Sequence, residues 1–520
     1  MILTGFAMAG GLCVLGGSTA MFEFTHGGGA VHPATVPSTL AHPRARPSVL
    51  SPSQIRRLHE VALDTLARGG IYLKYGPSRE LLRSHGASVD EARQLVRIPR
   101  GLVEQALTSA PRDFTLCSGS DASRDCHLGP EGGQYGRPVS GLNWIIDAGA
   151  ATRRPVTETD AVNWNRLAHG LPNMHVASAA YDQEGHPNSM DVRSVARMLQ
   201  STDKPLMMSA VSGEGMRWVK RLTDVTQPAG RHPRVMVLSS VNSPLIYGSG
   251  QTEAAMNSAE LGIPVAVNSS VMAGVSAPVT IAGALAQMHA EMLAALTIIK
   301  LHRPGAPIIY SGHPLIMDTR SGLASVGFTE IALLQAACID LGRYLGLPTG
   351  SNGLTTDTCT PDAMAASEKW SSAFLPALAG PNINAGAGSL ACLSTISLEQ
   401  LAIDDDIYGR IFRQLRGFNL DEETLAAEVI ARAGYDASFL GDDHTLAHFR
   451  SEHSYSDLAN RENAALWEAT GSKQVLQRAA AKAQSLLSDW QPVVSEDHRR
   501  EFSGLVARAE KALEAMQLPV

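Results

Sequence analysis

The residues that could do chemistry lie at the ends of short apolar segments in the middle of the chain. Asn268 ends one such segment, Tyr181 follows another, and His313, Asp318 and Arg320 follow a third. Because an arginine guanidinium binds a carboxylate through two parallel hydrogen bonds, Arg320 could hold an acidic substrate group. His313 could also bind such a group. The alternative for Asp318 and Arg320 is a pair that only braces its own loop.

Aromatic side chains form a second group of candidates. Phe, Trp and Tyr make up only 5% of the chain, so each one near a strand end is informative. The faces of such rings attract a quaternary ammonium group by cation–π interaction. We therefore expect substrate contacts from Trp144, Tyr181, Tyr310 and Phe328. Packing in the core is the alternative for each of them.

Two cysteines together with His313 could bind a metal ion. Cys359, Cys392 and His313 each follow a predicted strand, and two thiolates with a neutral imidazole would suit Zn²⁺. The six cysteines show no CxxC pair, which is typical of reduced thiols in a cytoplasmic protein. The sequence also has no GxxxxGK[ST], no GxSxG elbow, no HExxH and no GxGxxG after a strand.

The elements that must position these residues recur along the chain. Eight short segments end in small or polar residues, and a helix-like stretch follows each: 144–149, 175–180, 205–210, 235–240, 264–269, 307–312, 348–353 and 382–387. Their spacing of about 30 to 40 residues matches one strand-plus-helix unit. The sequence therefore predicts an α/β fold, a (β/α)8 TIM barrel, whose chemistry lies at the carboxyl ends of the strands.

Four domains are predicted from the positions of these units. They are a mobile extension and linker over 1–49, an N-terminal α+β cap over 50–139, the TIM-barrel catalytic domain over 140–417 and a C-terminal helical extension over 418–520. The uncharged residues 1–22 could form an export signal, but no Lys or Arg precedes their apolar run. A mobile extension is the interpretation that we prefer.

Composition restricts the partners. The net charge is −7 and no block of Lys and Arg stands out, so we expect no nucleic-acid partner. Five glycines among residues 1–22 argue against a membrane helix there, and no membrane partner is expected. An almost wholly apolar helix predicted from Pro278 to about His302 indicates buried packing, in the core or at a subunit interface. An Ala-rich helical region over 464–518 is typical of an outer layer or a dimerisation element, and we expect a homo-oligomer.

Several stretches of the sequence form a family pattern. They are Gln54–His59 with Gly86–Asp90, Thr202–Pro205, Asn242–Leu245, Met272–Gln287, Arg303–Pro307 with Met317–Gly322, and Phe439–Gly441 with His444–Leu446. Met272–Gln287 is quite specific. Over most of its length the chain resembles the trimethylamine methyltransferase family, in particular its members without pyrrolysine, which include glycine betaine methyltransferase.

The resemblance implies a TIM barrel that moves a methyl group from a small methylated amine to the cobalt of a separate corrinoid protein. The implied cofactor is cobalamin or a related corrinoid carried by that partner, with no tightly bound metal in this chain. Because cob(I)alamin is a strong nucleophile, it supplies the difficult chemistry, and the sequence assigns no catalytic residue. The chain contains no pyrrolysine, which favours a quaternary amine such as glycine betaine. Two alternatives remain. One is a zinc-dependent thiol or alcohol methyltransferase that uses Cys359, Cys392 and His313, and the other is a non-catalytic betaine-binding protein.

Overall fold

The computed structural model describes residues 46–227, 231, 233–435 and 438–516. The predicted extension over 1–49 therefore lies almost wholly outside the described residues, and so does the candidate export signal over 1–22.

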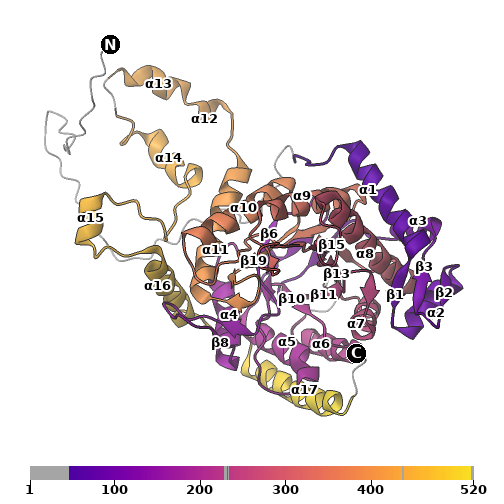
Figure 1. Cartoon of the computed structure of the whole chain (residues 1–520). Helices are drawn as coiled ribbons and strands as arrows, with labels where there is room; N and C mark the ends of the chain where they lie inside the picture. The colour runs from indigo at the N-terminus through magenta and orange to yellow at the C-terminus, as the bar shows by residue number, and fades with distance from the viewer. Residues whose placement is uncertain (1–45, 228–230, 232, 436–437, 517–520) are drawn as a thin grey trace. The chain divides into compact units, whose positions relative to one another are not determined.

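Eight parallel strands form the central sheet (Figure 1). Their order is β6 (Tyr135–Pro138), β19 (Ile383–Ala387), β18 (Thr349–Ser351), β15 (Ile308–Gly312), β13 (Val265–Ser269), β11 (Val235–Val241), β10 (Leu206–Ser209) and β9 (Ala177–Ser178). The carbonyl oxygen of Gly136 in β6 accepts hydrogen bonds from the amides of His175 (2.8 Å) and Val176 (3.3 Å), just before β9. The two edges of the sheet thus meet, which confirms the predicted TIM barrel.

The first predicted barrel strand is wrong. Residues 144–149 contain β7 (Trp144–Ile145), which belongs to a separate four-stranded sheet with β8, β20 and β21. The first barrel strand is β6, which lies inside the stretch that the sequence assigned to the N-terminal cap. Gly136 and Pro138 give it weak strand propensity, so the sequence did not indicate a barrel strand there. The barrel therefore begins before residue 140. Each of the other seven predicted segments contains a barrel strand.

One helix follows each barrel strand and packs on its outer side. These helices are α4 (Glu158–Gly170), α5 (Met190–Ser201), α6 (Gly213–Thr226), α7 (Ser249–Glu260), α8 (Ile281–His302), α9 (Thr329–Tyr344), α10 (Ala363–Ala379) and α11 (Leu398–Arg416). Their starts follow local chemistry, because the side chains of Thr157, Ser212, Thr280, Asp362 and Ser397 accept amide hydrogen bonds in the first turns.

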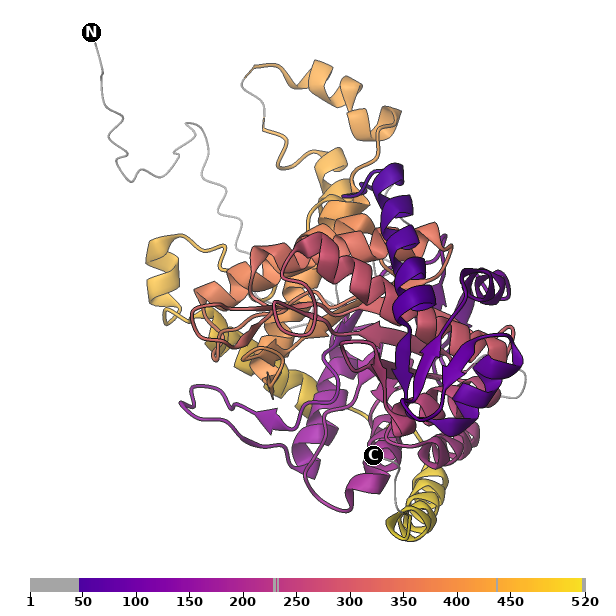
Figure 2. The same cartoon turned by 45° about the vertical axis from the view of Figure 1, so that its right-hand side comes forward.

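An N-terminal layer packs against the barrel helix α8 (Figure 2). Its elements are α1 (Pro52–Asp64), the π-helix η1 (Thr65–Gly69), β1 (Ile71–Leu73), α2 (Gly76–Ser84), β2 (Ser88–Asp90), β3 (Leu95–Arg97) and α3 (Arg100–Thr108). A barrel loop adds β12 (Ile246–Tyr247) to the edge of this sheet. The hairpin of β4 (Phe114–Leu116) and β5 (Cys126–Leu128) packs with the inward-facing residues of the barrel.

Short strands in the connections between barrel elements form two further sheets. The first contains β7, β8 (Arg154–Pro155), β20 (Ser389–Leu390) and β21 (Thr395–Ile396). The second contains β14 (Met272–Ala273), β16 (Leu315–Met317) and β17 (Ala324–Ser325), and two 3-10 turns are η2 (Ala122–Arg124) and η3 (Pro187–Ser189). Because these strands follow barrel strands, they extend the structure at the carboxyl ends of the barrel.

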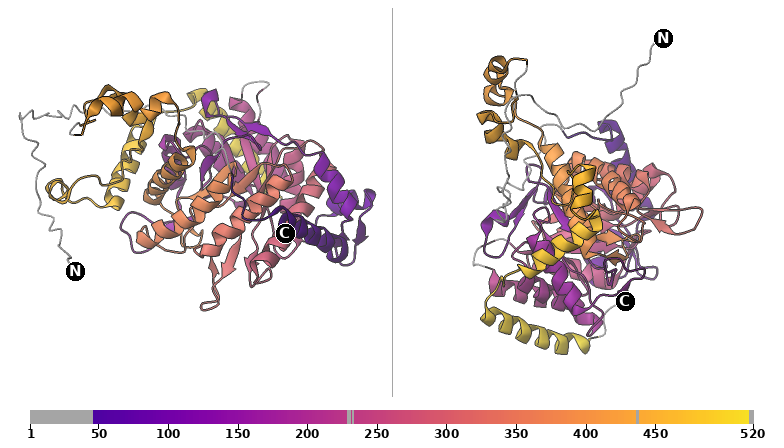
Figure 3. Two further views of the ribbon diagram at one scale, coloured as in Figure 1. Left: turned by 90° about the horizontal axis from the view of Figure 1, so that it is seen from above. Right: turned by 90° about the vertical axis from the view of Figure 1, so that its left-hand side faces the viewer.

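The C-terminal helices are of two kinds (Figure 3). α16 (Val475–Ser488) packs on α11 and α4, and α17 (Glu496–Glu514) packs on α5 and α6. The four helices before them contain no buried residue: α12 (Glu422–Leu425), α13 (Ala427–Ala433), α14 (Asp443–Glu452) and α15 (Ala464–Ala469).

Helix α8 is apolar because it is a core helix. Among the described residues, it alone is long and apolar enough to cross a membrane by length and composition, and 78% of its most apolar window is buried. Its side chains join one core cluster with α1, β13, β15 and α9. Burial against the sheet and the N-terminal layer therefore explains its composition.

A fully buried ion pair connects two barrel helices near the carboxyl ends of the strands. The ammonium of Lys369 on α10 lies 2.8 Å from the carboxylate of Asp404 on α11, and neither side chain is exposed. Lys369 also donates to the carbonyl of Leu354, while Asp404 accepts from the Gly388 amide and from Gln400. Every charged atom therefore has partners, as buried charges require.

Removing one partner of this pair should destabilise the protein strongly. Asp404→Asn leaves the Lys369 ammonium buried without a carboxylate, and we expect the free energy of unfolding to fall by about 3–5 kcal/mol. Asp406→Asn, which breaks a more exposed pair with Arg410 on the same helix, should lower it by about 1 kcal/mol or less. Urea unfolding followed by circular dichroism measures both, and equal losses would contradict the assignment.

Candidate active site at the carboxyl end of the barrel

The register of the barrel strands decides which side chains face inward. Met207, Met236, Ala266 and Ile309 belong to one interior cluster. Side chains alternate along a strand, so residues two or four positions further on also face inward, nearer the carboxyl end. These are Ser209, Leu238, Ser240, Asn268 and Ser311, and the pairing of Ser240 with Asn268 and of Asn268 with Ser311 agrees.

Solvent reaches this inward face on one side of the barrel. On β11 the inward-facing Leu238 and Ser240 are half-buried, whereas the outward-facing Val237, Ser239 and Val241 are buried. Ser209 on β10 is also half-buried. An enclosed strand would show no such alternation. The carboxyl end of the barrel is therefore accessible and lined by small polar side chains on this side, as the sequence predicted.

Arg137 on β6 also faces inward, and it is the main feature that the sequence analysis missed. The neighbouring Gly136 faces outward, because a Cβ there would lie 2.1 Å from the carbonyl oxygen of Asn173. Arg137 is only 2% exposed, and its Nε and Nη1 atoms have no hydrogen-bond partner in the described part of the chain. Burial lowers the pKa of Arg137 to about 10, so the guanidinium keeps its charge at neutral pH. A signal was available, since Tyr135 begins a strand one repeat length, roughly 40 residues, before His175.

His313 lies within electrostatic range of Arg137. Its Nε2 atom is 3.2 Å from the hydroxyl of Ser311. Burial, followed by the positive charge of Arg137, lowers the pKa of His313 to about 3. The imidazole is therefore neutral near pH 7 and a weak base. A Ser–His pair that must form an imidazolium during catalysis is disfavoured here, because that cation would arise beside a second one.

Asn268 is held rigidly in the interior. Its Nδ2 atom donates to the hydroxyls of Ser240 (3.2 Å) and Ser270 (3.1 Å). Its Oδ1 atom is buried and has no hydrogen-bond partner among the described residues. Of the residues predicted to bind substrate, Asn268 and His313 thus lie with Arg137 at the inward face. The Oδ1 atom of Asn268 is an acceptor that a ligand could use.

The two predicted tyrosines occupy different positions. Tyr181 follows β9 and is buried, and its hydroxyl donates to the Ser209 carbonyl (3.0 Å) beside the inward face. Tyr310 is buried on the outer face of β15, with its hydroxyl 2.7 Å from Nδ1 of His289 on α8. The prediction that Tyr310 contacts substrate is therefore wrong, because neighbouring residues of a strand point to opposite faces.

Trp144 and Phe328 lie in connections rather than in barrel strands. The guanidinium of Arg153 lies 4.7 Å from the centroid of the Trp144 ring, so a protein cation already covers one face of this ring. Phe328 is half-buried at the start of α9, after a loop whose Val326 and Gly327 amides donate to Asp357. Phe328 stays a candidate for substrate contact.

Asp318 and Arg320 form the loop brace that was the alternative to substrate binding. They lie between β16 and β17, where the Arg320 Nε atom is 3.1 Å from the Asp318 carboxylate and the Arg320 side chain is 86% exposed. Asp318 also accepts the Arg320 amide hydrogen bond. The pair therefore braces its own loop, and the Arg320 side chain extends into solvent.

The predicted zinc ligands do not form a site. Cys359 is exposed, whereas Cys392 is half-buried and its Sγ donates to the Ala324 carbonyl (3.3 Å). Burial raises the pKa of Cys392 to about 11, which opposes the thiolate that zinc needs. Within the described ranges, no three His, Cys, Asp or Glu residues come together in a way that could hold a metal ion. The zinc alternative is therefore not supported.

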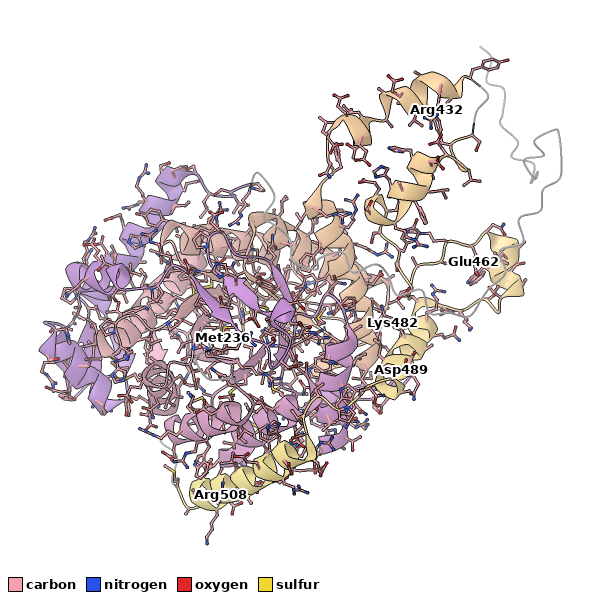
Figure 4. The ribbon with its side chains drawn as sticks, turned by 180° about the vertical axis from the view of Figure 1, so that it is seen from behind. Met236, Arg432, Glu462, Lys482, Asp489 and Arg508 are labelled. Atoms are coloured by element: carbon pink, nitrogen blue, oxygen red, sulfur yellow. The ribbon has the colours of Figure 1, made fainter. Side chains whose placement is uncertain are left out.

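A surface hollow elsewhere has no relation to this group. It has a volume of about 430 Å³ and is lined by Asp457, Lys473, Arg478, Ala481, Lys482, Ser485 and Leu486. Figure 4 shows Lys482 on the peripheral α16 and Met236 within the barrel. The inward-facing carboxyl end of the barrel thus remains the candidate active site.

The chain is similar to known methyltransferases over most of its length. Residues 26–514 match the family model described as trimethylamine methyltransferase. A trimethylamine methyltransferase of Desulfitobacterium hafniense (strain DSM 10664 / DCB-2) is 30% identical over 452 residues, covering 85% of this chain and 90% of the relative. A glycine betaine methyltransferase of Desulfitobacterium hafniense (strain Y51) is 30% identical over 458 residues, covering 86% and 93%.

More distant proteins are also similar. A trimethylamine methyltransferase of Methanosarcina barkeri is 29% identical over 484 residues, which cover 90% of this chain and 96% of the relative. The crystal structure of Methanosarcina barkeri monomethylamine methyltransferase has 10% identity and a TM-score of 0.46, and the match covers 85% of this chain and 93% of that one. With a family model matched over most of its length, the chain belongs to the trimethylamine methyltransferase family.

Proposed function

We propose that this protein transfers a methyl group from a quaternary methylammonium compound such as glycine betaine to the cob(I)alamin of a corrinoid partner protein. One observation supports this most directly: the accessible end of the barrel presents small neutral side chains, a neutral His313 and an unpaired Arg137. None of these is a general acid or base at neutral pH. Family membership supports methyl transfer as the reaction type.

Methyl transfer from a quaternary nitrogen has no need for such groups. The C–N bond breaks, its electron pair stays on nitrogen, and the methyl carbon bonds to cobalt through an electron pair from the reduced metal. The amine leaves as a neutral tertiary amine, so no proton moves. The protein must only hold the donor so that nitrogen, methyl carbon and acceptor lie in line. Asn268, which is fixed by two hydroxyls, suits this positioning role.

The acceptor is a corrinoid carried by another protein, so this chain must admit it rather than hold it. The serines at positions 209, 240 and 311 are small, so they fill less of the carboxyl end than larger side chains would.

We also propose a homo-oligomer in the cytoplasm. Several large apolar side chains are exposed on and around the four C-terminal helices without buried residues, namely Phe418, Leu420, Ile430, Leu440 and Leu446. Exposed apolar surface of this kind marks protein–protein contacts. None of the five cysteines in the described residues forms a disulfide, which fits a reducing compartment.

Purified protein should convert cob(I)alamin to methylcobalamin when a quaternary amine is present. We expect product from glycine betaine, followed by the absorbance of the methylated cofactor, and no product without the protein or with the demethylated amine. A methyl group on a positively charged nitrogen can be transferred because the nitrogen leaves as a neutral amine. Tight binding of glycine betaine with no methylcobalamin would instead indicate a non-catalytic binding protein.

His313 should contribute no pH dependence to this reaction. Because its pKa is lowered to about 3, the imidazole stays neutral from about pH 5.5 to 8, where an ordinary histidine would titrate. We expect a flat kcat over this range, and His313→Gln should lower kcat by less than about tenfold, whereas loss of a general base typically lowers it by about 100-fold or more. A rise in rate through pH 6.5 that His313→Gln abolishes would contradict this assignment.

A further inference from the structure

We infer that Arg137 is the residue that binds an anionic group of the substrate, so the substrate carries a carboxylate as well as a methylated ammonium. The substrate identity rests on the proposed function, but the anion site rests on the structure of Arg137 itself. Its guanidinium is buried, charged at neutral pH and faces the interior of the barrel. A buried charge without a partner is strongly unfavourable, and an anionic ligand would remove this penalty.

Arg137 differs from the other buried cations of the protein. Within the described ranges, every other buried lysine or arginine donates to at least one acceptor, as Arg193, Lys204, Arg234, Lys300 and Lys369 show. Lys204, for example, donates to two carbonyl oxygens at 2.7 Å. The fold thus satisfies buried cations wherever they serve only structure. Arg193 and Arg234 leave only Nε without a partner, whereas Arg137 makes no side-chain hydrogen bond to the described residues and leaves both Nε and Nη1 buried without one.

The surroundings of Arg137 provide no internal anion. Only a tyrosine, Tyr408, opposes the effect of burial on the pKa of Arg137, and no carboxylate of the described residues pairs with it. Nor can the strand turn Arg137 outward, because Gly136 is packed against Asn173 and Tyr408 on the outer face. The guanidinium must therefore remain inside the barrel and find its partner there.

A second unpartnered group lies on the opposite wall. In the strand order, β13 is four positions from β6, which is half of an eight-stranded barrel. Asn268 on β13 holds a buried Oδ1 atom without a hydrogen-bond donor, and such a partial negative charge favours the methyl groups of a quaternary ammonium ion. A free cationic donor group on one wall and a free acceptor on the other match the two ends of a zwitterion.

This arrangement also disfavours substrates without an anion. A small cation such as tetramethylammonium or protonated trimethylamine would enter a barrel that already contains the charge of Arg137, and like charges repel. Arg320 cannot take over the carboxylate, because it is exposed and paired with Asp318. Arg137 is therefore the specificity-determining residue for the carboxylate end of the donor.

Calorimetry on the full chain tests this assignment with two ligands that share one cationic head. Glycine betaine carries the carboxylate, and tetramethylammonium does not. We expect Arg137→Met to weaken glycine betaine binding by roughly 30-fold or more, since a charge pair loses one partner, and to leave tetramethylammonium binding unchanged or improved. Arg320→Met is the matched control and should alter neither. Equal affinities of wild type and Arg137→Met for glycine betaine would overturn the inference.

Thermal unfolding separates ligand binding from a structural role. Without ligand, Arg137→Met should melt at the same temperature as the wild type or higher, because an unpaired buried charge is removed. Glycine betaine should raise the melting temperature of the wild type only. If Arg137→Met does not fold, Arg137→Lys is the test variant. Loss of the bidentate contact should weaken glycine betaine binding about tenfold and leave tetramethylammonium binding unchanged. Equal weakening of the binding of both ligands would contradict a carboxylate contact.

Two further measurements distinguish the possible results. Tighter Arg137-dependent binding of phosphocholine than of glycine betaine would overturn the carboxylate in favour of a phosphate. Methyl transfer from tetramethylammonium but not from glycine betaine would support the methyltransferase proposal and contradict the role of Arg137. Arg137-dependent binding of glycine betaine without any methyl transfer would support the role of Arg137 and contradict the methyltransferase proposal.

Discussion

Closure of the parallel sheet at β6 is the constraint on which the candidate site depends. The carbonyl oxygen of Gly136 joins this strand to the chain before β9, and the outer face of Gly136 has no space for even one more carbon atom. Because side chains alternate along a strand, this tight outer contact fixes Arg137 on the inner face. A local packing requirement outside the barrel thereby decides which charge lies within it.

Along the barrel axis, the residues that stabilise the fold lie apart from those that could bind a ligand. Apolar side chains such as Met236 and Ile309 pack with the β4–β5 hairpin into a closed cluster. Nearer the carboxyl ends the inward-facing residues become small and polar, and solvent reaches Leu238 and Ser240. Outside the sheet, charged groups such as Lys369 and Asp404 are fully paired. The few unpaired groups at the inward face are therefore the ones available to a ligand.

The electrostatics of the site fit a reaction without proton transfer. Burial and the nearby guanidinium keep His313 neutral, which removes a base that the sequence alone would suggest. The same positive charge suits a donor that brings its own carboxylate, while the cationic nitrogen of that donor needs only positioning. A barrel that provides binding and alignment, with the nucleophile supplied by a partner, is consistent with the family to which the chain belongs.

The sequence by itself determined the repeating strand-plus-helix units, seven of the eight barrel strands, the buried character of α8 and the family, because these follow from local periodicity and from contiguous motifs. It could not place Tyr310 or Arg137. Which face of a strand a residue occupies depends on register, and a one-residue shift reverses it. The weak strand β6 exists only because its neighbours β19 and β9 supply its hydrogen bonds. Tertiary structure therefore decided that Tyr310 packs against His289 in the core, that Asp318 and Arg320 brace a loop, and that an unpaired arginine lies within the barrel.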